Sequence, residues 1–334
     1  MVFGGKLPVG KLPEDVLKKH VLKNLGHQRR DVVLWPGYGE DAGAVKTSKT
    51  VYVLSTDPIT GSKRFVGWLS VHASANDVAV SGAKPAWFSS TILLPKGSGY
   101  SDLSKIVRQI HSACRRLEVA VVTGHSEVAP FVTSPTVVGH MIGRLIVKKP
   151  ITSHGAKPGD HIIMAKSVGL EGAAIIASDY PHLLRRKKIG VKDITRASGF
   201  IRRTSVVEEA LAFAREGVSA MHDPTEGGLV GGLYEMAQAS SVGFYVERSK
   251  VLVDPLVEKI CRAVDIDPLK LISSGTLLAT APRLSRTIME KTGARVIGRV
   301  VRRKMGMRIL SENGEERIQG PVHDELWRFI VETK

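Results

Sequence analysis

Cysteine is nearly absent from this sequence. The chain of 334 residues has only Cys114 and Cys261, each isolated from any CxxC or Cys/His spacing. Two isolated cysteines argue against a disulfide framework and against a structural zinc site. We interpret both residues as small buried side chains rather than reactive thiols.

Long apolar runs are also missing. No stretch approaches the roughly 18 apolar residues of a membrane span, and the segment Met1–Lys6 lacks the apolar core of a signal peptide. We therefore expect a cytoplasmic protein without a membrane partner. Aromatic residues make up only 5% of the chain, but hydrophobic residues reach 43%, which is typical of globular proteins. The length suits two domains.

Amide side chains are scarce, while charged residues make up 24% of the chain, a bias that is typical of thermophiles. The 48 Lys and Arg against 32 Asp and Glu give a net charge of +16, which by itself suggests a nucleic-acid partner. The densest basic segment, 182–203, lacks the alternating aromatic residues of a base-stacking platform, so we do not expect nucleic acid to bind. Two interpretations of this segment stay open, a solvated helical face and a contact with an anionic substrate or partner.

Hydrophobic patterning predicts two α/β units separated by a turn-rich stretch at 148–160. We place the domains at 1–150 and 151–334. A strand at 51–56 is expected to stop at Pro58, which leaves Asp57 at its end. Further predicted strands are 87–94, 119–123, 136–147, 161–164, 243–246 and 277–281. Predicted helices are 66–81, 101–117, 169–178, 205–216 and 254–264, and a further helix is expected to follow a glycine-rich turn at 224–228 and to run to about 239.

Three aspartates of the first half lie beside small residues near the ends of predicted elements. Asp41 follows Glu40 in a glycine-containing loop, Asp57 ends a strand, and Asp77 lies near the end of a helix. Magnesium prefers carboxylate oxygens together with phosphates and water. We predict that these aspartates converge on a divalent cation, although each alone is also explained as a turn or cap residue.

The segment 124–127 is predicted to be a loop after a short buried strand. His125 in this loop is a candidate contact for phosphate or metal, and Glu127 is a candidate metal ligand. The alternative for both is an ordinary polar surface.

The sharpest motif of the second half is His222–Leu229, which contains Asp223 and a glycine pair. Thr225 is expected to cap the following helix, while Gly227 and Gly228 bring backbone N–H groups near an anion. A plain strand–turn–helix connection is the alternative. The turn at Ser274–Gly275 is similar but less specific. No P-loop, GxGxxG helix start or GxSxG elbow is present.

Taken in order, these motifs resemble the superfamily of aminoimidazole ribonucleotide (AIR) synthetase and HypE, which also includes selenophosphate synthetase and thiamine-monophosphate kinase. The resemblance is most specific in the N-D-x-A-x-x-G-A-x-P pattern. The matching segments are 39–42, 55–57, 76–85, 155–160, 223–229, where Glu226 replaces an arginine, and 273–278.

The resemblance implies a two-domain α/β fold of the PurM type, whose N-terminal sheet pairs with its twin in a homodimer. It also implies ATP and Mg²⁺, or Mn²⁺ or Ca²⁺ in its place, in a cleft lined by clustered aspartates. The implied metal ligands are Asp41, Asp57, Asp77 and Asp223. Our candidate catalytic residues are Asp57 and Asp77, together with His125, whose phosphate contact we infer from its loop and not from the resemblance. The implied cofactor contacts are Gly39, Asn76, Asp223, Thr225, Gly227, Gly228, Ser274 and Gly275.

Three departures from the family pattern limit this expectation. The G-G-D-T loop, whose aspartate is commonly a metal ligand, appears here as Thr123–Ser126, with His125 in its place. HypE carries its carbamoyl group on a C-terminal cysteine, whereas this sequence ends Phe329–Lys334, so we do not expect HypE function itself. The reactive N-terminal residue of selenophosphate synthetases is missing, and glycines and lysines at 4–6 and 10–11 form either a phosphate-covering arm or a frayed terminus.

The hypothesis from sequence is a metal-dependent enzyme that binds ATP or another phosphorylated compound and transfers or hydrolyses a phosphoryl group. Two alternatives stay open, a phosphatase without a separate acceptor and a non-catalytic metal- or nucleotide-binding regulator.

Overall fold

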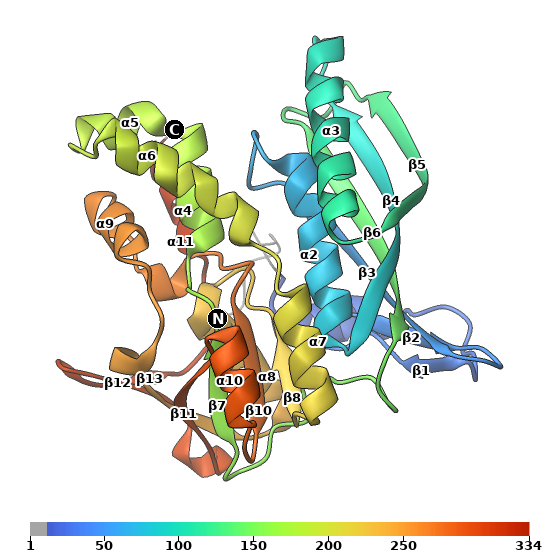
Figure 1. Ribbon diagram of the computed structural model, residues 1–334, viewed down its shortest axis with the longest axis vertical. Coiled ribbons are helices and arrows are strands. Elements are labelled where there is room, and N and C mark those ends of the chain that lie inside the picture. The colour runs from blue at the N-terminus through green and yellow to red at the C-terminus, as the bar shows by residue number, and fades with distance from the viewer. Residues whose placement is uncertain (1–11, 334) are drawn as a thin grey trace.

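The computed structural model describes residues 12–333 and contains two β-sheets, each with its own helices (Figure 1). The glycine- and lysine-containing arm predicted at 4–6 and 10–11 lies outside the described residues. No helix in the described range is long and apolar enough to cross a membrane.

The N-terminal sheet has six strands in the order β1-β2-β3-β6-β4-β5, and only β4 and β5 run parallel. Helices α2 and α3 lie on one side of it, whereas no helix covers the opposite side of β4, β5 and β6 in Figure 1. The element bounds are α1 Glu14–Val16, η1 Leu17–Val21, β1 Val32–Leu34, β2 Gly43–Lys46, β3 Val51–Ile59, α2 Val66–Val80, β4 Ala83–Leu94, α3 Tyr100–Arg116, β5 Ala120–Val128 and β6 Thr136–Leu145.

The C-terminal sheet has seven strands in the order β13-β12-β9-β11-β7-β10-β8. Its bounds and those of its helices are β7 His161–Ala165, α4 Leu170–Asp179, α5 Pro181–Arg186, α6 Val191–Ser198, η2 Gly199–Arg203, α7 Val207–Glu216, β8 Ala220–His222, α8 Gly228–Ser240, β9 Gly243–Glu247, η3 Arg248–Lys250, α9 Pro255–Ala263, η4 Pro268–Lys270, β10 Leu277–Ala281, α10 Arg286–Thr292, β11 Arg295–Val301, η5 Arg303–Met305, β12 Met307–Ser311, β13 Gly314–Ile318 and α11 Glu325–Thr333. The predicted boundary at 150 falls in the connection between the two sheets.

One hydrophobic core is shared by the two halves. Helix α2 contributes Val71 and Val78 to it, and α7 of the C-terminal half contributes Ala210 and Phe213. Burial of this apolar surface is the main favourable contribution to folding, so the junction between the domains is part of the protein interior.

Helix α2 packs unusually close to the N-terminal sheet. A Cβ atom added at Gly139 of β6 would lie 2.3 Å from the backbone oxygen of Ser70, and one added at Gly143 would lie 2.3 Å from Val78 Cγ1. Only glycine permits this approach. The two glycines therefore set the depth at which α2 lies on the sheet.

The predicted helices 66–81, 101–117 and 254–264 are confirmed to within two residues at each end as α2, α3 and α9. The expectation that Pro58 ends a strand is wrong, because β3 continues to Ile59. Strand β2 pairs with β3 only as far as Leu54, so the later part of β3 has one unpaired edge, where a proline is tolerated.

The expectation of a short buried strand at 119–123 followed by a loop at 124–127 is also wrong. Strand β5 runs from Ala120 to Val128, and every residue in it is exposed. It is the last strand of its sheet, so its backbone pairs only with β4. An edge position accepts the polar sequence that we interpreted as a loop.

We expect Gly139→Ala to lower the free energy of unfolding by about 1–3 kcal/mol, because the added methyl group overpacks the contact between α2 and β6. Gly190→Ala is the matched control, since no atom lies within 4 Å of its Cβ position. Chemical denaturation of both variants tests this, and equal stability of the two would show that the close approach is not energetically important.

Candidate metal and phosphate site

Three aspartates from separate segments meet where the two domains join. Asp41 precedes β2, Asp77 lies near the end of α2, and Asp223 follows β8. One carboxylate oxygen of each lies within 4.8 Å of one from each of the others. The structure therefore brings together three of the four predicted metal ligands, one of them from the C-terminal domain.

Asp77 and Asp223 are buried and Asp41 is half-buried, so the cluster concentrates acidic groups away from water. Burial raises the pKa of Asp77 well above its ordinary value, and repulsion from Asp223, Asp57 and Asp41 raises it further, while the Ser55 hydroxyl, which donates to Asp77, opposes the shift. Burial and then the Asp41 carboxylate likewise raise the pKa of Asp223. Carboxylates placed this close cost free energy unless a proton or a cation compensates them.

Asp223 provides the clearest indication of a cation. Only 1% of the residue is exposed, and in the described part of the chain its carboxylate oxygens have no hydrogen-bond partner besides the neighbouring Asp77 carboxyl. Buried polar atoms normally have a partner. A hard divalent cation with oxygen ligands supplies such a partner, so the donor set fits Mg²⁺, Mn²⁺ or Ca²⁺.

His222 links this cluster to helix α8. Its Nδ1 lies 2.8 Å from Asp41 Oδ1 and its Nε2 lies 3.2 Å from Glu235 Oε2, with the ring almost fully buried. Burial opposes the charged imidazole, but Asp41 and Glu235 outweigh it and raise the pKa of His222 to about 10. His222 is thus a fixed positive charge beside the aspartates. Sequence reasoning assigned it no role, although its place next to Asp223 in the motif was a usable signal.

Asp57 lies on β3, close enough to raise the pKa values of Asp77 and Asp223. It is not one of the three aspartates whose oxygens converge. Its predicted roles in metal binding and catalysis stay predictions. Gly39 has a φ of +77° and packs against Glu235 and Ala239 of α8, beside the Asp41 loop.

The glycine turn at Asp223–Gly228 differs from expectation at Thr225. Helix α8 starts after Gly227 without a side-chain cap, so the expectation that Thr225 caps it is wrong. Both glycines have positive φ values. The N–H of Gly227 donates to Asp324 Oδ2 at 2.6 Å, and that of Gly228 donates to the Thr225 carbonyl at 3.0 Å. Anion binding by this turn stays a prediction, since both N–H groups already have partners.

Asn76 and the turn at Ser274–Gly275 lie along the domain junction. The Asn76 amide donates to the Thr204 carbonyl and accepts from the Val206 N–H, both at 2.9 Å. The Ser274 N–H donates to the buried Glu171 carboxylate at 3.0 Å. Their predicted contacts with a cofactor stay predictions, and Glu171 is a residue that sequence reasoning missed.

His125 is not part of the cluster within one chain. It lies on β5, separated from β3 by β6 and β4, and its Nε2 is 3.2 Å from Glu127 Oε2 on the exposed strand. The side chain lines a cavity of about 410 Å³ together with Thr56, Thr123 and His140. Its predicted contact with phosphate, and the metal role of Glu127, stay predictions.

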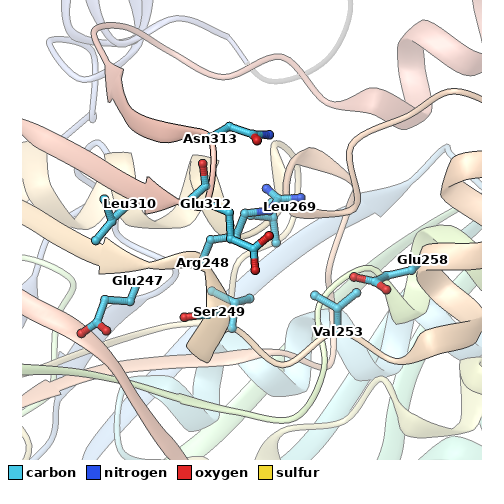
Figure 2. A pocket seen from close by; sticks show the side chains of 11 residues that line it. Glu247, Arg248, Ser249, Val253, Glu258, Leu269, Leu310, Glu312 and Asn313 are labelled. Carbon is cyan, nitrogen blue, oxygen red and sulfur yellow. The ribbon is translucent and has the colours of Figure 1, made fainter.

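Another cavity, of about 540 Å³, lies in the C-terminal domain. Side chains from the end of β9, from α9 and from the tip of the β12–β13 hairpin surround it in Figure 2, among them Glu247, Glu258 and Glu312. It contains none of the site residues predicted from sequence. The two cysteines are confirmed as buried, and burial raises the pKa of each thiol to about 12.

Comparison with known proteins agrees with the motifs. Residues 39–145 match the model of the N-terminal domain of AIR synthase related proteins, and residues 157–310 match the model of the C-terminal domain. Carbamoyl dehydratase HypE of Cupriavidus necator is 30% identical over 262 residues, which cover 73% of this chain and 70% of that protein. The chain belongs to the AIR synthase-related family.

Solved structures share this PurM-like fold. A hydrogenase maturation protein HypE in complex with ATP has a TM-score of 0.69 at 22% identity, and the match covers 97% of this chain and 98% of that one. AaThiL in complex with AMPPCP and TMP has a TM-score of 0.75 at 18% identity, over 96% and 99% of the two chains. At these identities the likeness establishes the fold.

We expect the stability of the protein to fall between pH 5 and pH 8 by an amount that depends on Glu171. Burial raises the pKa of Glu171 from its ordinary 4.5 to about 7, so the folded chain keeps a proton that the unfolded chain has already lost. The stabilisation is complete below the unfolded pKa and is lost as the pH rises through the folded pKa.

The glutamine of the Glu171→Gln variant does not titrate. Between pH 5 and pH 8 the free energy of unfolding should therefore fall less in the variant than in the wild type, by about 1–3 kcal/mol. Denaturation curves at several pH values measure the difference. Parallel pH profiles for the two proteins would contradict the expectation.

Proposed function

We propose that the chain is a metal-dependent enzyme that binds ATP and transfers its terminal phosphoryl group to an oxygen of an acceptor. The observation that carries this proposal is the cluster of Asp41, Asp77 and Asp223, in which the buried Asp223 carboxyl faces other carboxyl groups. Phosphoryl transfer depends mainly on positioning and on neutralising charge. The solved relatives that bind ATP or AMPPCP support the choice of nucleotide.

In this proposal, Asp41, Asp77 and Asp223 hold Mg²⁺, and Asp57 lies beside them. The bound cation would neutralise phosphate charge, as metals do in other phosphoryl transfers. His222 orients Asp41 through its 2.8 Å contact, and Glu235 orients His222 in turn. Such outer partners of a ligand typically affect metal affinity by 10- to 100-fold, roughly.

Several relatives of this chain are carbamoyl dehydratases, and this favours an amide oxygen as the acceptor. Dehydration of a carbamoyl group must remove its oxygen, and phosphorylation turns that oxygen into a leaving group. Cys114 and Cys261 are buried, so neither is a suitable carrier of the substrate. We therefore propose a free amide or a group on another protein as acceptor, and hydrolysis without an acceptor is the second candidate.

The test is ATP turnover with Mg²⁺ by wild type and by Asp223→Asn. We expect the variant to lose turnover at least 100-fold and to lose the rise in melting temperature that Mg²⁺ gives to the wild type. Without metal the variant should melt higher than the wild type, because one of the mutually repelling carboxylates is neutral.

Asp265→Asn is the control, since Asp265 is exposed and its φ of +58° suits asparagine. An Asp223→Asn variant that keeps both turnover and the Mg²⁺ response would contradict the proposal. Turnover that no amide or other acceptor accelerates would favour simple hydrolysis.

We also propose that the chain forms a homodimer through its N-terminal sheet, at the exposed edge strand β5. Val121, Val122 and Val128 of β5 are each more than half exposed, and Phe131 is 95% exposed. Exposed apolar side chains along an edge strand are typical of an interface. Light scattering at micromolar concentration should give twice the chain mass of 36.2 kDa, and a stable monomer would contradict this arrangement.

A further inference from the structure

Helix α4 begins with a buried carboxylate that none of the sequence motifs pointed to. Glu171 is the second residue of the helix, and only 3% of it is exposed. Its Oε2 accepts the N–H of Ser274 at 3.0 Å. A buried carboxylate costs free energy without such a donor. The hydrogen bond between Ser274 and Glu171 therefore links the start of α4 specifically to the turn before β10.

That turn, residues 273–276, is held to the start of α4 by further bonds. The Ser273 hydroxyl accepts the Gly169 N–H and donates to the Leu271 carbonyl, both at 2.7 Å. Thr276 donates its hydroxyl to the Ser167 carbonyl at 3.0 Å. The bond from Glu171 is the one among these that reaches the middle of the turn.

The turn is also in contact with both sides of the candidate site. Gly275 has a φ of +100°, and a Cβ added there would lie 2.7 Å from the Arg203 carbonyl oxygen and 2.7 Å from Thr204 Cα. Thr204 is the residue whose carbonyl accepts from Asn76, the neighbour of Asp77. On the other side, the Ser273 N–H donates to the Thr225 carbonyl of the glycine turn at 3.3 Å.

Glu171 is electrostatically part of the same cleft. Its pKa is raised first by burial and also by the carboxylates of Asp57 and Glu226, which belong to the two domains. It is not a member of the converging trio of aspartates. Its contacts run to the turns of the C-terminal domain rather than to the cation position.

We propose that Glu171 is a positioning residue for the nucleotide: by holding the Ser274 N–H it fixes the turn 273–276 between the Asn76–Thr204 contact and the glycine turn. This inference rests on the proposed function. It requires that nucleotide affinity depends on Glu171 whereas cation affinity does not. A residue with a merely structural role would change both affinities together or neither.

The experiment measures, by calorimetry on the full chain, the affinity for Mg²⁺ alone and for ATP in the presence of Mg²⁺. Glu171→Ala should weaken ATP binding at least ten-fold and leave Mg²⁺ binding within about three-fold of the wild type. Glu171→Gln keeps an oxygen within reach of the Ser274 N–H, and it should bind ATP within about three-fold of the wild type.

Glu171→Asp keeps the carboxyl group but shortens the side chain, so it should behave like Glu171→Ala. It also serves as the second variant if Glu171→Ala does not fold. Ser285→Ala is the control: Ser285 caps the distant helix α10 through the N–H of Ile288, so its loss costs stability without touching the cleft. It should leave both affinities unchanged.

Amide hydrogen exchange at Ser274–Thr276 provides the second readout. Exchange should be faster in Glu171→Asp and unchanged in Glu171→Gln. ATP binding that is equally weak in Glu171→Gln and Glu171→Ala, or unchanged in Glu171→Asp, would overturn the inference alone. A wild-type chain that binds Mg²⁺ but no ATP would overturn the proposed function, and the inference with it.

Discussion

The mutual repulsion of Asp41, Asp77 and Asp223 constrains the whole arrangement of the two domains. Bringing three carboxylates within 4.8 Å of one another costs free energy that other parts of the fold must offset. This cost is offset by the close packing of α2 on β6 at Gly139 and Gly143 and by the core shared with α7. The buried positive charge of His222 also offsets it. The cluster therefore has a local cost in stability that a bound cation would relieve.

The parts of this site that were predictable from sequence are those whose signal is local. Helix α2 follows from the spacing of its apolar residues, and Asp77 stands out in it because it lies beside small residues near the end of the helix. The glycine turn and β10 were recognisable for the same reason. Asp57 lies near the cluster on a strand that is longer than Pro58 suggested, and its predicted metal role stays a prediction.

The parts that were missed depend on partners far away in the chain. The role of His222 follows from Asp41, 181 residues earlier, and that of Glu171 follows from Ser274, 103 residues later. A single sequence contains no record of such pairs. Strand β5 was misjudged for a different reason: the polar residues around His125 are compatible with an exposed edge strand and with a loop, and only the neighbour β4 decides between them.

The core shared by α2 and α7 has a consequence for how the protein comes apart. Two sheets with separate strand orders suggest two units that melt independently, yet Phe213 and Ala210 of one half are buried with Val71 and Val78 of the other. Opening the junction would expose this apolar surface in both halves at once. The chain should thus behave as one cooperative unit, and the closeness of the aspartates is preserved until the entire molecule unfolds.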